Sequence, residues 1–149
     1  MIVLSNSAVQ VIPVGGTVTF DLTVIHTGCD RNGCGGSEYH RQGSGAVRLR
    51  GRGNRCGQAS IFDLSFNGNV TSGTAGTEVQ LAMTVDGTPL AETTMIETIG
   101  TANSYQNLAA RTYLKVCPGC EDITLSVTNT GTEPVTVDAN TALTVRRIA

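Results

Sequence analysis

The chain has 149 residues and a formal net charge of −2, so its length fits one domain and its overall charge favours neither nucleic acid nor an anionic membrane. No apolar run approaches the ~20 residues of a membrane helix, and the N-terminal stretch lacks the basic and long apolar regions of a secretory signal. Aromatic residues make up only 4% of the chain, whereas Val, Ile, Leu and Thr carry its apolar and β-branched content. That composition suits pleated sheets.

Turn residues recur at intervals of about 8–12 residues, the spacing expected of a β-sandwich or barrel, and no window shows a helical period. The strands predicted in the first part of the chain are Ile2–Leu4, Val9–Ile12 and Thr17–His26. In the last of these, the apolar residues at even positions from Val18 to Val24 share one face, which predicts a half-buried strand.

The second part of the chain continues the same pattern. Phe62, Leu64 and Phe66 alternate with polar residues, so we expect them to point into the core. Asp86-Gly87 is a tight hairpin signal. The strands predicted here are Ala59–Val70, Glu78–Val85, Pro89–Ile99, Leu108–Val116, Asp122–Asn129, Val135–Val137 and Ala142–Ile148. The sequence therefore predicts one all-β domain over residues 1–149, a sandwich of about ten antiparallel strands.

Between these two parts lies a Gly-, Arg- and Cys-rich insertion at about residues 27–56. The stretch His26–Cys56 holds six of the ten Lys and Arg residues, both histidines and three of the five cysteines. Only Ala46–Arg50 within it reads as a regular element. We expect this insertion to be a docking loop carried by the scaffold.

The cysteines allow three states. Cys117 and Cys120 have CxxC spacing, and Cys29 and Cys34 could complete a four-thiolate zinc site with them. A disulfide within or between the two pairs, or reduced thiols, are the other readings, and Cys56 is left over in either pairing. A thioredoxin-like role is disfavoured because no helix follows the CxxC. We expect these four cysteines to brace the loop, with no metal and no cofactor.

Arginines are the sharper feature of the insertion. In a strand, Arg48, Arg50 and Arg52 would share one face, and Arg41 and Arg55 lie nearby. Such a patch suits an acidic partner surface or a polyanionic glycan. Alternatives are a charged edge strand that blocks aggregation, or ion pairs with Asp63 or Glu78 at subunit contacts. Nucleic acid is disfavoured because stacking aromatics are sparse.

No enzyme motif is present: the chain lacks GxSxG, P-loop and HExxH patterns. His26 and His40 are the only imidazoles, and neither stands in a recognisable nucleophile–base arrangement. We therefore expect a non-enzymatic protein.

Four stretches carry a resemblance to a known family: Val11–Asp21 (VIPVGGTVTFD), Ile61–Val70 (IFDLSFNGNV), Val79–Leu90 (VQLAMTVDGTPL) and DITLSVTNTGTEPVTVDANTALTVRRIA from Asp122 onward. Their order resembles the jelly-roll family of tumour necrosis factor and the complement globular heads, most closely its bacterial and phage branch. The resemblance implies a ten-strand jelly roll that assembles as a homotrimer. Tyr105, Tyr113 and Phe62 would then help to fill the subunit interface.

The resemblance and the missing enzyme motifs lead to an expected role. We expect a structural virion protein of a tailed bacteriophage, made in the host cytoplasm, whose homotrimers decorate or cement the capsid exterior on the major capsid protein lattice. The alternative is a carbohydrate- or receptor-binding head domain of a phage fibre or of a bacterial or spore surface. A small hydrolase dependent on His26 or His40 is a third reading, which no sequence feature favours.

Overall fold

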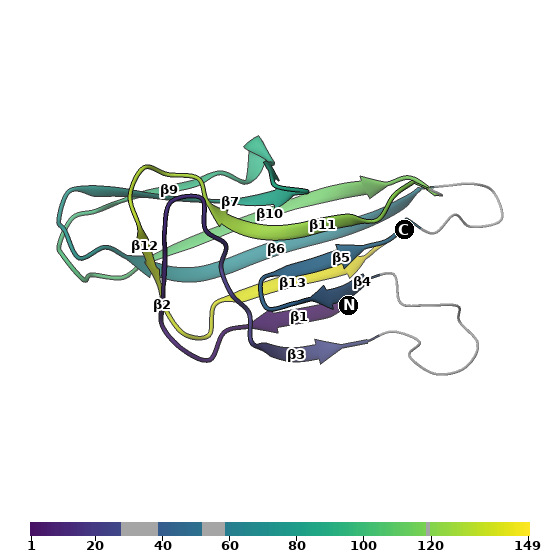
Figure 1. The fold of residues 1–149 in the computed structure, drawn as a ribbon, viewed down its shortest axis with the longest axis horizontal. Coiled ribbons are helices and arrows are strands. Elements are labelled where there is room, and N and C mark those ends of the chain that lie inside the picture. Colours follow the sequence, from purple (N-terminus) through teal and green to yellow (C-terminus); the bar gives the residue numbers. More distant parts are fainter. Residues whose placement is uncertain (28–38, 52–58, 119) are drawn as a thin grey trace.

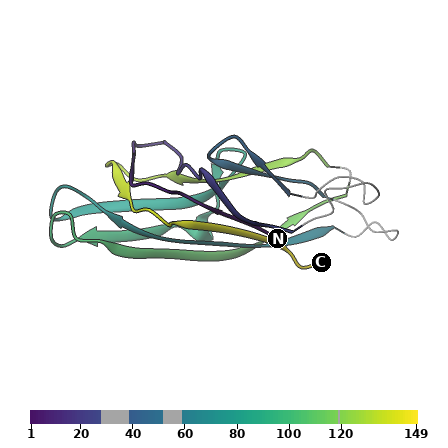
Figure 2. The same ribbon diagram turned by 90° about the horizontal axis from the view of Figure 1, so that it is seen from below.

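The structure is a computed structural model that describes residues 1–27, 39–51, 59–118 and 120–149. In these residues two antiparallel β-sheets pack face to face (Figure 1). Figure 2 shows them edge-on as two layers, with both chain termini beside the same layer. No helix in the described residues is long and apolar enough to cross a membrane.

Sheet A has seven strands in the order β2-β12-β6-β13-β1-β3, and β10 pairs with the other side of β6. Its strands are β1 (Ile2–Ser5), β2 (Gln10–Ile12), β3 (Leu22–His26), β6 (Ser60–Thr71), β10 (Gln106–Val116), β12 (Val135–Val137) and β13 (Ala142–Arg147). The long central strand β6 organises the sheet, since β12 and β13 follow one another along one edge of it while β10 pairs along the whole other edge.

Sheet B has six strands in the order β4-β5-β11-β7-β8, and β9 also pairs with β7. Its strands are β4 (Tyr39–Gln42), β5 (Ala46–Leu49), β7 (Thr77–Val85), β8 (Thr88–Pro89), β9 (Met95–Ile99) and β11 (Ile123–Asn129). A 3-10 turn, η1 (Ala91–Thr93), separates β8 from β9, so the predicted strand Pro89–Ile99 is in fact interrupted.

One apolar core fills the space between the sheets. The prediction for β6 is confirmed, because Phe62, Leu64 and Phe66 are all at most 1% exposed. Phe62 is therefore a core residue and is not available for the subunit interface that the sequence suggested. Val18 and Phe20 are also fully buried, as predicted.

The predicted strand Thr17–His26 is only partly correct. Regular pairing begins at Leu22, and Leu22 and Val24 are 45% and 60% exposed. The physical reason is that β3 is the edge strand of sheet A, and its register with β1 shifts between Val3 and Leu4. The hydrophobic alternation therefore does not carry through to Val24.

The sequence gives no prediction for strand β4, whereas the regular element expected at Ala46–Arg50 is β5, which ends one residue earlier, at Leu49. The two form a hairpin in which Tyr39 pairs with Leu49 and Gln42 with Ala46. Gly43, in the connecting turn, has a φ of 61°, a conformation that favours glycine. The insertion thus adds an edge hairpin to sheet B.

Candidate functional site

The predicted site residues divide between described and undescribed parts of the chain. Arg41, Arg48 and Arg50 lie in the described residues, as do Cys117 and Cys120. The remaining predicted site residues, Cys29, Cys34, Arg52 and Arg55, lie outside them.

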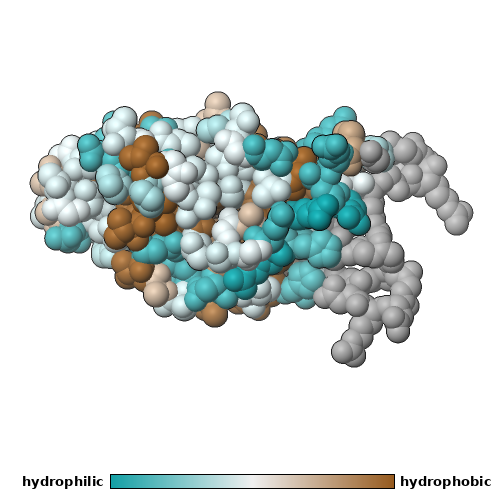
Figure 3. All heavy atoms as spheres, viewed as in Figure 1, coloured by the Kyte–Doolittle hydropathy of each residue, from teal (hydrophilic) through white to brown (hydrophobic). Residues whose placement is uncertain are grey.

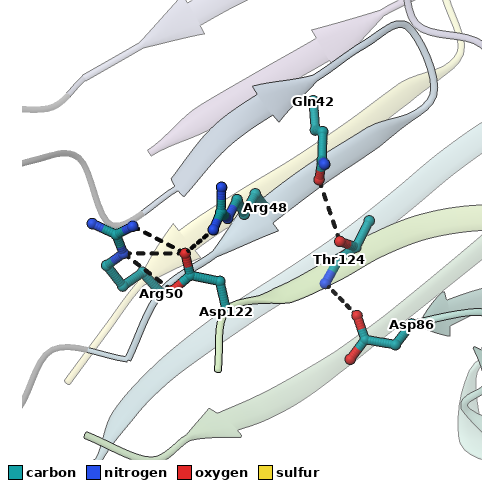
Figure 4. A network of polar contacts seen from close by, with 6 residues as sticks. All are labelled: Gln42, Arg48, Arg50, Asp86, Asp122 and Thr124. Carbon is teal, nitrogen blue, oxygen red and sulfur yellow. Dashed lines mark hydrogen bonds and ion pairs between the residues drawn. The ribbon is translucent and has the colours of Figure 1, made fainter. Parts of the chain in front are cut away.

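Arg48 and Arg50 share a single carboxylate, that of Asp122 (Figure 4). Arg48 Nη2 lies 2.6 Å from Asp122 Oδ2, and Arg50 donates from Nε and Nη2 at 3.1 and 3.0 Å. The hydrogen bond from Arg50 lowers the pKa of Asp122 below its ordinary value. These pairs tie the end of β5 to the residue before β11, within one chain.

The alternative that these arginines pair with Asp63 or Glu78 at subunit contacts concerns a second chain and stays a prediction; within the single chain they pair with Asp122. Asp63 pairs with Arg111 and Arg146 instead. Asp122 stands 72 positions from Arg50 in the sequence, and no local pattern links the two residues. Only the pairing of β5 with β11 brings them together.

The network extends across the outer face of sheet B. The backbone N–H of Thr124 donates to Asp86 Oδ1 at 2.8 Å, and the Thr124 hydroxyl donates to Gln42 Oε1 at 3.3 Å (Figure 4). Two carboxylates, those of Asp86 and Asp122, therefore accompany the two arginines. Within the described residues this surface is charge-balanced, so the cationic docking patch stays a prediction.

Figure 3 shows how polarity is distributed over this side of the molecule. Hydrophilic residues gather toward the right of this view, and hydrophobic ones gather around β2 and β12. Val9, Val11 and Val14, in and beside β2, are 53%, 65% and 53% exposed.

Cys117 and Cys120 form a disulfide, one of the states that the sequence left open. It closes the connection that carries the chain from β10 in sheet A to β11 in sheet B, and both cysteines are exposed. Among the described residues, no group of three or more His, Cys, Asp or Glu side chains is placed to hold a metal ion. Whether this disulfide braces the insertion stays a prediction.

Asp63, Arg111 and Arg146 form a second ion cluster, in the middle of the outer face of sheet A. Arg111 Nε and Nη2 donate to the two Asp63 oxygens at 2.8 and 2.9 Å, and Arg146 Nη2 donates at 3.0 Å. The bond from Arg111 is the main cause that lowers the pKa of Asp63. The Arg111 guanidinium also lies 5.7 Å from the centre of the Tyr113 ring.

Three-dimensional comparison identifies the fold. Two crystal structures of murine APRIL, at pH 5.0 and pH 8.5, match 99% of this chain and 98% of their own, each with a TM-score of 0.60 and with 14% and 13% identity. The chain is thus a jelly roll of the tumour necrosis factor type, as the sequence predicted. At this identity the likeness concerns the fold alone.

Carbohydrate-binding modules are also similar at a lower level. A CBM35 from Cellvibrio japonicus Abf62 matches 99% of this chain and 98% of its own, with a TM-score of 0.39 and 14% identity, too low to carry an argument. No family model matches the sequence, and no curated protein matches it. The bacterial and phage branch of the family stays a prediction.

Proposed function

We propose that this protein is a structural component of a tailed-bacteriophage virion, a homotrimer that decorates the capsid exterior and binds the major capsid protein lattice. The observation that carries the assembly part is the outer face of sheet A, which presents apolar and aromatic side chains to solvent in the single chain. The capsid part is supported by the resemblance to the phage branch of the jelly-roll family.

The strand registers define this face. One row crosses the sheet through Arg111, Ser65, Thr144, Val3 and Ile25. The adjacent rows hold Tyr113, Asp63 and Arg146 on one side, and Asn67, Ser5 and Leu22 on the other. Tyr113 is 59% exposed, Leu22 45% and Ile25 39%.

The chemistry of the face suits burial against another protein surface. Between Ile25 and Arg111 its middle row holds only Val3, Thr144 and Ser65. The Asp63 carboxylate in the next row is already paired with two arginines. Asp63 is 9% exposed in the single chain, whereas Arg111 and Arg146 are 58% and 54% exposed. The cluster therefore presents an excess of one positive charge with its internal hydrogen bonds already made.

Sedimentation of two variants tests the assembly. Tyr113→Lys places a new cation beside Arg111 on the proposed interface, so a trimer should dissociate toward single chains at micromolar concentration. Val14→Lys places the same charge at an exposed position in the turn after β2 and should leave the trimer intact. A wild-type mass of one chain contradicts the proposal.

Cryo-microscopy of undecorated capsid shells tests the capsid role. Purified wild-type protein should add stoichiometric density at three-fold-related positions on the exterior, because repeated weak contacts give avidity on a lattice. The Tyr113→Lys variant should lose that density if the trimer is the binding unit. If the wild-type trimer adds no density to the shells, the capsid role is wrong, while the proposal of a trimer still holds.

A second candidate function is a carbohydrate- or receptor-binding head domain. It is favoured by a pocket of about 350 Å³ lined by residues from β1, β3 and β4, at the edge of the sandwich where the insertion begins. Saturable binding of a glycan by the isolated protein, without shells, distinguishes this function from the first.

A further inference from the structure

The pocket lies where the two sheets end on the same side of the sandwich. β3 is the last strand of sheet A, and β4 is the first strand of sheet B. Figure 1 shows β3 along the lower edge of the molecule, with β1 and then β4 above it. The described lining residues are Ile2, Thr23, His26, His40 and Arg41.

Strand register explains why polar side chains line an opening between two sheets. Ile2 pairs with His26, and Leu4 pairs with Thr23, so His26 and Thr23 share the inward face of sheet A with the core residues Ile2 and Leu4. Ile2 is 1% exposed and forms an apolar floor. The ring of His26 meets that of Tyr39 edge-on at 5.9 Å, a contact that holds the imidazole beside the pocket.

Arg41 supplies the charge. Its Nε donates to the carbonyl of Gly43 at 2.9 Å and its Nη1 to the carbonyl of Asp21 at 3.1 Å. These two hydrogen bonds fix the guanidinium in place. Because a guanidinium has five N–H donors, other donors remain available to a ligand. The Asp21 carboxylate accepts hydrogen bonds from the backbone N–H and the hydroxyl of Ser7.

The charge of Arg41 therefore differs from that of four other arginines in the described residues. Arg48 and Arg50 pair with Asp122, and Arg111 and Arg146 pair with Asp63. In the described part of the chain Arg41 makes no ion pair within 4.0 Å. The hydrogen bonds from Ser7 are the main cause that lowers the pKa of Asp21, and the charge of Arg41 contributes only the smallest of the causes. A positioned guanidinium with spare donors at the mouth of a pocket suits a carboxylate, which it can bind through two parallel hydrogen bonds.

We propose that this pocket binds a carboxylated sugar, with the carboxylate on Arg41 and the sugar hydroxyls on Thr23 and His26. Imidazole and hydroxyl groups both donate and accept hydrogen bonds, as sugar hydroxyls require. The apolar floor at Ile2 suits the C–H face of a pyranose ring. The guanidinium disfavours a metal cation between the two histidines. The proposal rests on the second candidate function and not on the capsid role.

Glucuronic acid and glucose form a matched pair that differs at C6, where one has a carboxylate and the other a hydroxymethyl group. Titration of the wild-type protein with each, followed by 1H–15N NMR, should give saturable shifts with glucuronic acid at residues 23, 26, 40 and 41. Glucose should bind roughly ten-fold more weakly or not at all, since it lacks the charge-assisted hydrogen bonds. Acetate, which has the carboxylate without the ring, should also bind at least ten-fold more weakly.

Arg41→Gln should remove the preference for glucuronic acid over glucose, and Lys115→Gln, which removes an equal charge from an exposed position on β10, should keep it. Because Arg41 also holds β4 to the residue before β3, the thermal unfolding of the variant must be compared with wild type. Thr23→Val, at an exposed position on the inward face of β3, is the second variant: it removes the hydroxyl, keeps nearly the same shape, and should weaken binding of glucuronic acid without unfolding the edge.

Three results overturn the proposal: equal binding of glucuronic acid and glucose, equal binding of acetate and glucuronic acid, or shifts confined to other residues. If neutral glycans bind elsewhere on the protein, the second candidate function stands while this site assignment fails. If no sugar of either kind binds, both fail together.

Discussion

Gly51 lies directly against the backbone carbonyl of Cys117, with no space for a side chain between them. This contact places the residue after Arg50 beside the disulfide-closed connection, close to the Asp122 carboxylate that holds both Arg48 and Arg50. The end of β5 is thus fixed to the β10–β11 connection by close backbone packing as well as by ion pairs.

Gly51→Ala should therefore lower the free energy of unfolding by about 2 kcal/mol or more, because the new methyl group overlaps a backbone carbonyl that cannot rotate away. Gly73→Ala is the matched control, since a Cβ there meets nothing within 4 Å. It should change stability by less than about 0.5 kcal/mol. Equal losses in urea unfolding of the two variants would contradict the close packing at Gly51.

Asn129 should be one of the most sensitive polar residues. Its side chain, in a residue 1% exposed, donates to the carbonyls of Ile12 and Glu133 and accepts from the N–H of Gly131. Asn129→Ala leaves these backbone groups without that partner, which should cost about 3 kcal/mol in unfolding free energy.

Gln80→Ala provides the comparison for Asn129. The Gln80 amide donates one hydrogen bond, to the hydroxyl of Thr130 at 2.9 Å, and the residue is half-buried. Its loss should cost no more than about 1 kcal/mol. If chemical denaturation ranks the two variants in the opposite order, the buried asparagine does not hold β2 to the end of β11 in the way that its bonds indicate.

Much of this fold could be predicted from the alternation of apolar and polar residues along the chain. This pattern is reliable in central strands that bury one face. Phe62, Leu64 and Phe66 illustrate this, because a one-residue slip would expose all three phenyl and leucyl side chains. Alternation failed at Val24, since the chain there runs along a sheet edge with a register shift. It could not reveal β4, where three of four residues are exposed and only the pairing with β5 defines the strand.

The polar clusters were beyond prediction for a different reason. The clusters around Asp63 and Asp122 both join residues that are distant in sequence and adjacent only through strand pairing. The sequence singled out Arg48 and Arg50 correctly as neighbours, yet gave no signal for Asp122 as their shared partner. A cation-rich run indicates where charge lies, while the fold decides which charges are already neutralised.

The pH dependence of stability should carry a contribution from Asp63. Its pKa in the folded protein is lowered from 3.8, first by the hydrogen bond from Arg111 and then by that from Arg146. A lowered pKa means that the folded state favours the ionised carboxylate, so the contribution is present above about pH 4 and is lost as pH falls through the folded-state pKa. NMR titration of the side-chain carboxyl carbon should give a midpoint below the ordinary value.

Arg111→Gln should move that midpoint upward and reduce the loss of stability in acid. Lys115→Gln, on the same strand, removes the same charge without touching Asp63 and should leave the midpoint nearly unchanged. An Asp63 midpoint at or above 3.8 in the wild-type protein would show that the two arginines do not stabilise its ionised form.

The disulfide between Cys117 and Cys120 should have a small, local effect. It joins residues three positions apart, and closing so short a loop stabilises the folded state by about 2 kcal/mol at most through the entropy of the unfolded chain. The double variant Cys117→Ser, Cys120→Ser should lose no more than that in unfolding free energy. Faster amide exchange should be confined to the β10–β11 connection and the end of β5, because Gly51 packs on the Cys117 carbonyl and Asp122 holds Arg48 and Arg50.

Reductant applied to the wild-type protein and to this double variant separates the disulfide from the three other cysteines, Cys29, Cys34 and Cys56. A decrease in unfolding free energy on reduction that appears only in the wild-type protein is due to the Cys117–Cys120 bond. An equal loss in both proteins assigns the effect to the other cysteines, and accelerated exchange throughout sheet A would contradict a local role. Since both bonded cysteines are exposed, small thiols can reach them without prior unfolding, so the wild-type loss should develop under native conditions.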